Sequence, residues 1–313
     1  MLSAIVFPGQ GSQAVGMLSE LAAEWPQVSE VFAEASDVLG YDLWRLVQEG
    51  PDTALNQTDK TQPAMLAAGI ATWRVWQAAG GVTPDYMAGH SLGEYTALVA
   101  AGAIEFGSTI KLVEKRGQLM QAAVPKGQGA MAAVLGLTDE QVISICDQAS
   151  EGEVVQAVNF NAPGQVVVAG TSTAVERATA LAKEAGAKRA LILPVSVPSH
   201  CSLMKDAADE LAQSLADLNI SLPNISVLHN VDVAQHVNAD EIRDVLARQL
   251  YSPVRWVETV RKLSEAGVSV LVECGPGKVL AGLNKRIERS MTTMSVVDAK
   301  SLTTAVEDHK AKS

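Results

Sequence analysis

Cysteine is scarce in this chain, which contains only Cys146, Cys201 and Cys274, an odd number spread widely along the sequence. This excludes a disulfide framework, and without a CxxC pair nothing suggests a zinc site. Basic residues are also in the minority, since 24 Lys and Arg face 35 Asp and Glu and leave a formal net charge of −11. Such a chain is not expected to bind nucleic acid, which requires a basic surface.

Long apolar runs are absent as well. No stretch approaches the ~20 apolar residues of a membrane span, and the first residues, MLSAIVFPGQGSQ, lack the basic start of a signal peptide. Cysteines without partners fit a reducing compartment. We therefore expect a cytoplasmic protein that binds neither membrane nor nucleic acid.

The residues that are present suffice for a large core. The chain has 313 residues, of which 48% are hydrophobic, and a prior of roughly 150 residues per domain predicts about two domains. Strands alternate with helices at both ends of the chain, an order that predicts a parallel sheet covered by helices on both faces. Residues 125–198 instead follow the order strand, helix, strand, strand, helix, strand, which is that of the split βαβ or ferredoxin-like unit.

We therefore expect an α/β fold with a large subdomain over residues 1–124 and 199–313 and an inserted ferredoxin-like small subdomain over residues 125–198. The tail from Lys300 is polar and lacks apolar periodicity, so it is expected to be loose. The clearest expected strands and helices cover residues 3–7, 62–79, 86–89, 92–101, 129–135, 189–195, 268–272 and 294–297.

A serine lies where a strand is expected to pass into a helix. Gly89-His90-Ser91-Leu92-Gly93 fits the pattern G-x-S-x-G. Small residues on both sides allow a sharp turn that lifts the hydroxyl above the sheet, and the helix N-terminus offers N–H groups to a developing oxyanion. We interpret Ser91 as a nucleophile; the alternative is an ordinary strand-to-helix turn.

An activated serine needs a base, and five histidines are available. His200 directly follows the inserted unit, and because a loop at a domain seam faces a cleft, it is the expected base. His229, near a strand end, is the alternative. No acidic residue between Ser91 and His200 lies at a strand end, so the pattern predicts a dyad in which a backbone carbonyl orients the imidazole. Three histidines are set aside because they adjoin the serine, lie in a polar loop or lie in the tail: His90, His236 and His309.

One charge stands out in an otherwise amphipathic helix. Arg116 lies 25 residues after Ser91, beside Lys115. It belongs either to a solvated basic face or to a buried site that binds a substrate carboxylate bidentately, a role for which arginine is better suited than lysine. The sequence alone leaves both interpretations open.

Together these motifs resemble those of the malonyl-CoA:acyl-carrier-protein transacylases of type II fatty acid synthesis and of the related polyketide acyltransferases. The resemblance covers nearly the whole chain. The ordered segments that carry it are Phe7-Pro8-Gly9-Gln10-Gly11-Ser12-Gln13, Gly89-His90-Ser91-Leu92-Gly93-Glu94-Tyr95, Gln118-Leu119-Met120, Gly129-Ala130-Met131-Ala132-Ala133-Val134, Asn159-Phe160-Asn161, Val197-Pro198-Ser199-His200, Gln249-Leu250-Tyr251 and Glu273-Cys274-Gly275-Pro276-Gly277.

The resemblance implies a hydrolase-like large subdomain with an inserted ferredoxin-like small one, in agreement with the pattern of elements. It also implies that Ser91 attacks a malonyl thioester and holds the acyl group as an ester. His200 would serve as base and then as acid, oriented by the carbonyl of Gln249. The backbone N–H groups of Gln10 and Leu92 would form the oxyanion hole.

For the ligands, the resemblance implies that Arg116 binds the free carboxylate of malonate and that Asn161 lines the cleft from the small subdomain. The substrate would be malonyl-CoA, a coenzyme A thioester, and the acceptor the phosphopantetheine thiol of an acyl carrier protein, reached by a ping-pong route. No metal and no bound cofactor are implied, and a monomer is expected. The choice between malonyl and methylmalonyl stays open.

A docking surface for the carrier protein is a further expectation. Carrier proteins of this family are strongly acidic, so an acidic chain must concentrate positive charge locally to bind one. The candidates are Lys188 with Arg189 and Lys285 with Arg286, although ordinary surface charge is the alternative interpretation.

Three rival functions share much of this pattern. A serine hydrolase or thioesterase would use the same core, but Arg116 and the missing triad acid argue against it. A non-catalytic docking domain would have no use for Ser91, His200 and Arg116, so the presence of all three argues against it. A free-standing polyketide acyltransferase would use the same chemistry, and the sequence does not separate it from the fatty acid enzyme.

Overall fold

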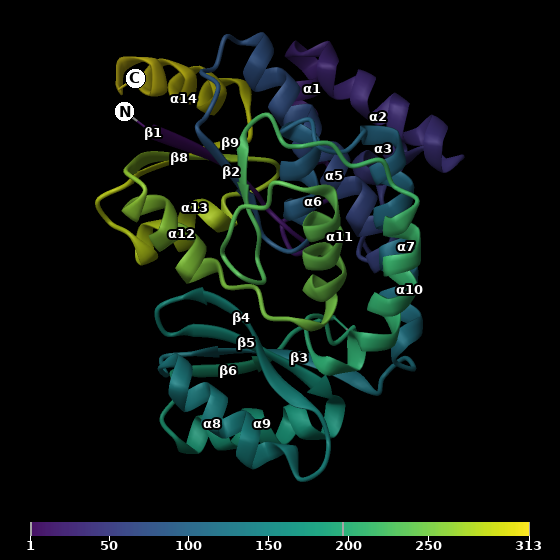
Figure 1. Ribbon diagram of the computed structural model, residues 1–313, viewed down its shortest axis with the longest axis vertical. Helices are drawn as coiled ribbons and strands as arrows, with labels where there is room; N and C mark the ends of the chain where they lie inside the picture. Colours follow the sequence, from purple (N-terminus) through teal and green to yellow (C-terminus); the bar gives the residue numbers. More distant parts are fainter. Residues whose placement is uncertain (1, 196, 313) are drawn as a thin grey trace.

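Two β-sheets organise the chain, and the computed structural model describes residues 2–195 and 197–312 (Figure 1). The larger sheet is parallel, with the strand order β7-β2-β1-β8-β9. Its strands are β1 (Leu2–Phe7), β2 (Tyr86–Gly89), β7 (Ser226–Leu228), β8 (Val268–Cys274) and β9 (Thr292–Val296). The smaller sheet is antiparallel, with the order β4-β5-β3-β6. Its strands are β3 (Gly129–Leu135), β4 (Val155–Ala162), β5 (Gln165–Thr171) and β6 (Arg189–Ile192).

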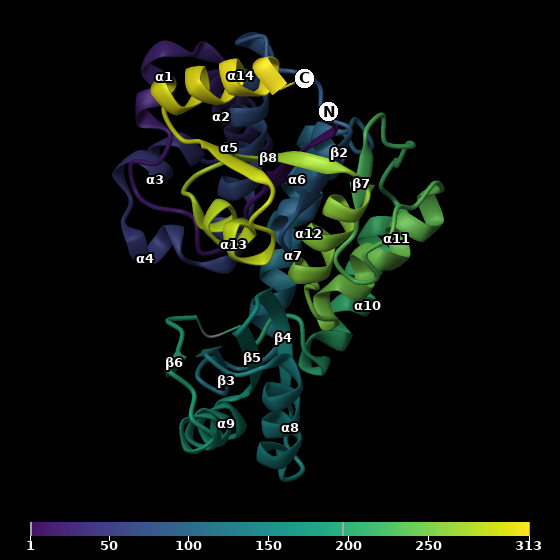
Figure 2. The same ribbon diagram turned by 90° about the vertical axis from the view of Figure 1, so that its left-hand side faces the viewer.

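Helices surround the parallel sheet and cover one face of the antiparallel one (Figures 1 and 2). Those before the small sheet are α1 (Ser19–Glu24), α2 (Pro26–Leu39), α3 (Leu43–Glu49), α4 (Asp52–Leu55), α5 (Thr58–Ala78), α6 (Leu92–Ala100) and α7 (Phe106–Ala123). Those of the small part are α8 (Asp139–Ser150) and α9 (Ser172–Glu184). Those after it are α10 (Lys205–Ala216), α11 (Ala239–Arg248), α12 (Trp256–Glu265), α13 (Val279–Ile287) and α14 (Ala299–Lys312).

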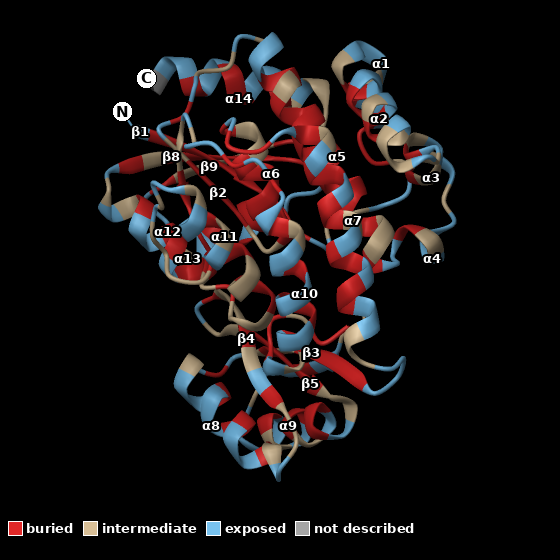
Figure 3. Cartoon of the chain, turned by 45° about the vertical axis from the view of Figure 1, so that its right-hand side comes forward, coloured by how far each residue is buried: buried red, intermediate tan, exposed pale blue. Residues whose placement is uncertain are grey.

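The core of the large part lies on both faces of the parallel sheet, as its apolar strands predict. Along β1, Ile5 and Phe7 belong to the apolar cluster that includes α5 and α7, whereas Ala4 and Val6 belong to the cluster that includes α12 and α13. Figure 3 shows β1 and most of the long helix α5 in the colour of buried residues. The carboxyl ends of β1, β2 and β7 are therefore held in place by a core that packs against both faces of the sheet.

The antiparallel sheet is built entirely from residues 129–192, inside the range predicted to be an insertion. The order β3-α8-β4-β5-α9-β6 confirms the predicted ferredoxin-like unit. Helix α8 begins with a capping box, in which Thr138 Oγ1 accepts from the N–H of Gln141. Backbone bonds join this part to the large one: Val254 donates to Val158, and Phe160 donates to Val254.

The C-terminal segment corrects one expectation. Residues Ala299–Lys312 form helix α14 instead of a loose tail, and Leu302, Ala305, Val306 and His309 are buried. Their spacing places all four on one helix face. The His309 ring lies 5.6 Å from the ring of Trp76. This histidine therefore packs on the buried face of α14 together with the three apolar residues.

Several boundaries also differ from expectation, and the two largest differences are at β6 and α5. Strand β6 ends at Ile192 instead of continuing to residue 195, and α5 begins at Thr58, four residues before its apolar stretch. Among the described residues, no helix is long and apolar enough to cross a membrane.

Candidate active site

The predicted turn at Ser91 is present and strained. Strand β2 ends at Gly89 and α6 begins at Leu92, so Ser91 lies between them with φ 52° and ψ −111°. The two flanking glycines allow the elements to touch: a methyl group on Gly89 would lie 1.8 Å from the carbonyl carbon of Gly93, and one on Gly93 would lie 2.1 Å from the carbonyl oxygen of Phe7. Close packing therefore requires glycine at both positions, and the serine is held at a strained turn.

His200 faces this serine directly. Ser91 Oγ lies 2.8 Å from His200 Nε2, and His200 Nδ1 lies 2.7 Å from the carbonyl oxygen of Gln249. A carbonyl can only accept, so Nδ1 carries the proton and Nε2 is left to accept from the serine hydroxyl. A short 3₁₀ turn at Gln249–Tyr251 places that carbonyl. The three groups lie in the arrangement of a serine–histidine dyad.

Arg116 is buried and lies beside the dyad. Its side chain is 1% exposed, whereas the adjacent Lys115 is exposed, so the solvated-face interpretation is wrong. Nη1 donates to Gln62 Oε1 over 2.7 Å and Nη2 to Gln249 Oε1 over 2.9 Å. Nη2 also lies 3.5 Å from Ser91 Oγ. In the described part of the chain its bonded partners are neutral, which leaves a buried cation without an ion pair next to the serine.

Burial sets the protonation state of His200. Desolvation, followed by the neighbouring Arg116 charge, lowers its pKa to about 3. The imidazole is therefore neutral at physiological pH and free to accept a proton. Burial also lowers the pKa of Arg116 below its ordinary value, but from a starting value so high that the guanidinium keeps its charge.

A cavity of about 490 Å³ opens over these groups. Ser91, His200 and Arg116 line it, together with Gln10 and Leu92, the two residues expected to supply oxyanion donors. Leu92 is the first residue of α6, so its N–H belongs to the unbonded start of the helix. The structure thus places five of the predicted site residues around one hollow.

Asn161 lies elsewhere than expected. The small part contributes Asn159 to the lining of the cavity, whereas Asn161 Oδ1 lies 2.8 Å from His90 Nε2. Strand β4 has a register irregularity between Phe160 and Ala162, which the pattern of the sequence does not show. Asn161 therefore bonds to His90, a residue of the cavity lining, and is not itself among the described residues that line the cavity.

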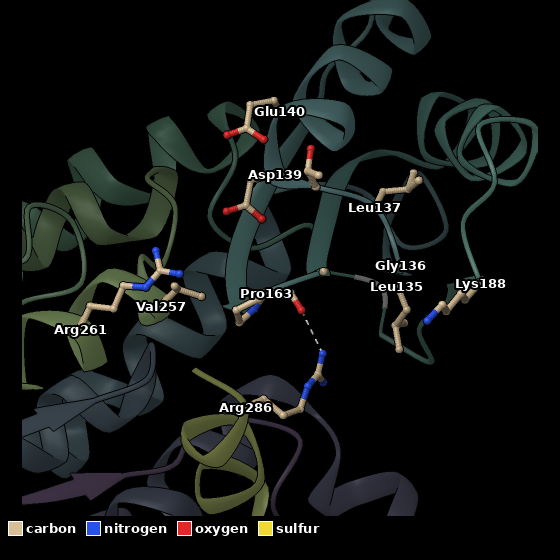
Figure 4. A pocket seen from close by; sticks show the side chains of 12 residues that line it. Leu135, Gly136, Leu137, Asp139, Glu140, Pro163, Lys188, Val257, Arg261 and Arg286 are labelled. Carbon is tan, nitrogen blue, oxygen red and sulfur yellow. Dashed lines mark hydrogen bonds between the residues drawn. The ribbon is translucent and has the colours of Figure 1, made fainter. Parts of the chain in front are cut away.

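Two of the four basic docking candidates line a different cavity, of about 630 Å³, between α8, the β4–β5 turn and helices α12 and α13 (Figure 4). Arg286 donates there to the carbonyl of Pro163 and to Gln165, so it fastens α13 to the β4–β5 turn. Lys188 lines the same cavity. Lys285 and Arg189 are exposed on the surface.

The alternative base is excluded by its surroundings. His229 is fully buried, does not line the cavity over Ser91, and bonds through Nδ1 to Glu94.

Sequence reasoning missed two contacts of the site. Asn230 Oδ1 accepts from the N–H of Ser91 over 2.8 Å, and Gln62 accepts from Arg116. Both residues lie far from Ser91 along the chain, so no local motif indicates them.

An α/β core that carries a serine–histidine pair at a strand-to-helix turn is typical of enzymes that form an acyl ester on serine, the hydrolases and the acyltransferases. Residues 4–311 match the acyl transferase domain family. The chain is 61% identical to the malonyl CoA-acyl carrier protein transacylase of Haemophilus influenzae over 97% of this chain and 98% of that protein. It is 57% identical to the Escherichia coli K12 protein of the same name, with the same coverage.

Solved structures agree with these relatives. An acyl carrier protein S-malonyltransferase from Vibrio cholerae superposes with a TM-score of 0.95 at 61% identity, over 97% of this chain and 99% of that one. A malonyl-transacylase in complex with a type II PKS acyl-carrier protein superposes with a TM-score of 0.97 at 57% identity, over 98% and 100%. The chain belongs to the malonyl CoA-acyl carrier protein transacylase family of acyltransferases.

Proposed function

We propose that this enzyme transfers a malonyl group from malonyl-CoA to the phosphopantetheine thiol of an acyl carrier protein, through a malonyl ester on Ser91. The observation that carries the proposal is the buried Arg116, whose partners are neutral and whose Nη2 lies 3.5 Å from Ser91 Oγ. A short acyl group held on that oxygen places a free carboxylate against the guanidinium. An acetyl group offers no such partner, so malonyl is selected.

The reaction follows from the positions of the groups. Ser91 Oγ attacks the thioester carbonyl while His200 Nε2 takes its proton, and the N–H groups of Gln10 and Leu92 stabilise the oxyanion. The C–S bond then breaks, and His200 returns the proton to the leaving coenzyme A sulfur. In the second half-reaction the phosphopantetheine thiol attacks the ester, and the same steps run in reverse. A thiolate is a good leaving group, so the dyad needs no buried acid.

The test is the intact mass of the protein after brief incubation with malonyl-CoA or with acetyl-CoA. We expect a malonyl adduct on the wild type and none on Ser91→Ala. Arg116→Ala should lower malonyl loading by roughly 10- to 100-fold, because a charge-assisted bond contributes about 1.5–3 kcal/mol. Lys115→Ala is the matched control, one residue away but exposed, and should load normally.

A malonyl adduct that persists on Ser91→Ala would contradict the mechanism. Rapid release of free malonate without carrier protein would instead indicate a hydrolase.

The polyketide pathway is the second candidate, because a neighbour with 57% identity was solved with a type II PKS acyl-carrier protein. Transfer rates to carrier proteins of the two pathways, measured side by side, separate these roles. The cytoplasmic location and the monomeric state stay predictions.

A further inference from the structure

A buried carboxylate lies beneath the turn that holds Ser91. Glu94, in the first turn of α6, is 0% exposed. Its Oε1 accepts from His229 Nδ1 over 2.8 Å, and its Oε2 accepts from the N–H of Asn230 over 2.9 Å and from Gln249 Nε2 over 2.8 Å. A fully buried carboxylate is costly to keep unless such donors surround it, and the mechanism above assigns it no task.

One branch of this network fixes the side chain of Gln249. The Gln249 amide donates through Nε2 to Glu94 and accepts through Oε1 from Arg116. A carboxylate can only accept and a guanidinium can only donate, so the amide has a single allowed orientation. Without Glu94 the amide loses one of the two acceptors that hold Nε2, which leaves the carbonyl of Ser91 as the remaining acceptor and weakens the orientation that presents Oε1 to Arg116.

The other branch reaches the nucleophile. Asn230, whose N–H is bound to Glu94, accepts from the N–H of Ser91 over 2.8 Å and donates to the carbonyl of Gly89 over 2.7 Å. Gln249 Nε2 also donates to the carbonyl of Ser91 over 3.0 Å. The strained turn is thus held from both sides by residues that are themselves fastened to Glu94.

We infer that Glu94 is a positioning residue that couples the dyad to the carboxylate-binding arginine of the proposed function, on which this inference rests. Gln249 is the shared part, because its backbone carbonyl orients His200 while its side chain positions Arg116. Loss of Glu94 therefore slows loading of every acyl group and, separately, weakens the preference for malonyl over acetyl. A residue that only stabilised the fold would not change that preference.

The experiment measures single-turnover loading of malonyl-CoA and acetyl-CoA by intact mass, for Glu94→Ala and Glu94→Gln, each with and without Arg116→Ala. We expect Glu94→Ala to slow both reactions and to lower the malonyl preference by roughly tenfold, the size of one weakened charge-assisted bond. In the Arg116→Ala background the preference should not change further.

Glu94→Gln is nearly isosteric and decides the outcome should Glu94→Ala not fold. The side-chain oxygen of the new glutamine can accept hydrogen bonds from Asn230 and Gln249 only if its NH₂ group faces His229 Nδ1. That arrangement moves the His229 proton to Nε2, which has no hydrogen-bond partner in the described part of the chain. We therefore expect the same two effects, smaller in size.

Glu273→Gln is the control, because Glu273 is also 0% exposed and accepts backbone N–H groups, those of Leu280 and Ala281. It should lower stability and leave the preference intact. Folded Glu94 variants with the wild-type preference, or an equal fall in the Arg116→Ala background, would overturn the role of Glu94. A wild type that forms no malonyl ester would instead overturn the proposed function.

Discussion

At the scale of the residue, the decisive feature is that two buried groups keep unlike protonation states side by side. His200 is neutral because burial and the Arg116 charge lower its pKa to about 3. A histidine acts as a base only while it is neutral, so protonation at low pH abolishes loading. Because the pKa is lowered, that loss falls well below the usual value near 6.5.

The corresponding prediction concerns pH dependence. The rate of Ser91 malonylation should stay nearly constant from pH 8 down to pH 5, measured by rapid quench and intact mass. In Arg116→Ala, assayed with acetyl-CoA, His200 loses a neighbouring cation, so its pKa rises and the acid limb moves to higher pH. A wild-type profile that halves near pH 6.5 would show that the imidazole titrates as an ordinary exposed histidine.

How far a site residue could be predicted depends on how local its evidence is. Ser91 lies in a turn whose chemistry is complete within five residues, and His200 lies at a visible change of pattern. Glu94 lies three residues after Ser91, yet its partner His229 is 135 residues away along the chain. The burial of Arg116 likewise depends on packing between distant segments, so periodicity within its own helix could not settle its role.

At the scale of the element, contact between α6 and β1 is what fixes the position of the serine. The methyl group of Gly93→Ala would meet backbone atoms of Phe7 and Pro8 at 2.1–3.0 Å, and backbone cannot rotate away as a side chain can. We expect this substitution to destabilise the fold by about 1–3 kcal/mol, the usual range for overpacking, and to slow loading by displacing Ser91.

Gly282→Ala is the matched control for this prediction. Gly282 also lies in a helix, α13, but a methyl group there meets nothing within 4 Å. It should stabilise the protein by about 0.5–1 kcal/mol, because alanine is the better helix former. Denaturant unfolding and loading rates of both variants provide the measurement. Equal stabilities for the two would refute the packing argument.

The C-terminal segment, which was expected to be loose but forms α14, shows how packing between elements decides local structure. In α14 the four buried positions are occupied by leucine, alanine, valine and histidine, and only two of these are strongly apolar. The helix gains its stability from packing on β9 and, through His309, on Trp76. Tertiary contacts of this kind decide a weakly patterned segment, whereas strands with continuous apolar runs, such as β1 and β8, could be predicted from their composition.

At the scale of the whole molecule, the proposed function requires a chain of formal net charge −11 to bind a carrier protein that is itself expected to be acidic. Exposed cations near the boundary between its two parts are the proposed docking residues. Arg286 is a poor choice for a test, because it also fastens α13 to the β4–β5 turn (Figure 4). Its reversal would disturb the relative placement of the two parts, and with it the cavity that both line, so that both half-reactions would suffer.

Lys188 and Lys285 are both exposed and are better suited to a test of the docking surface. Reversal of both to Glu should raise the apparent KM for carrier protein on the order of fivefold and leave malonyl loading of Ser91 unchanged, since exposed ion pairs contribute about 0.2–1 kcal/mol each. Added salt should shrink the difference by screening. Reversal of both Lys300 and Lys310 to Glu, exposed on α14 at the end of the molecule opposite the small sheet (Figure 1), changes the net charge by the same amount and is the control for net charge alone. A rise in KM shared by that control would show that overall charge, and not a local surface, governs the encounter.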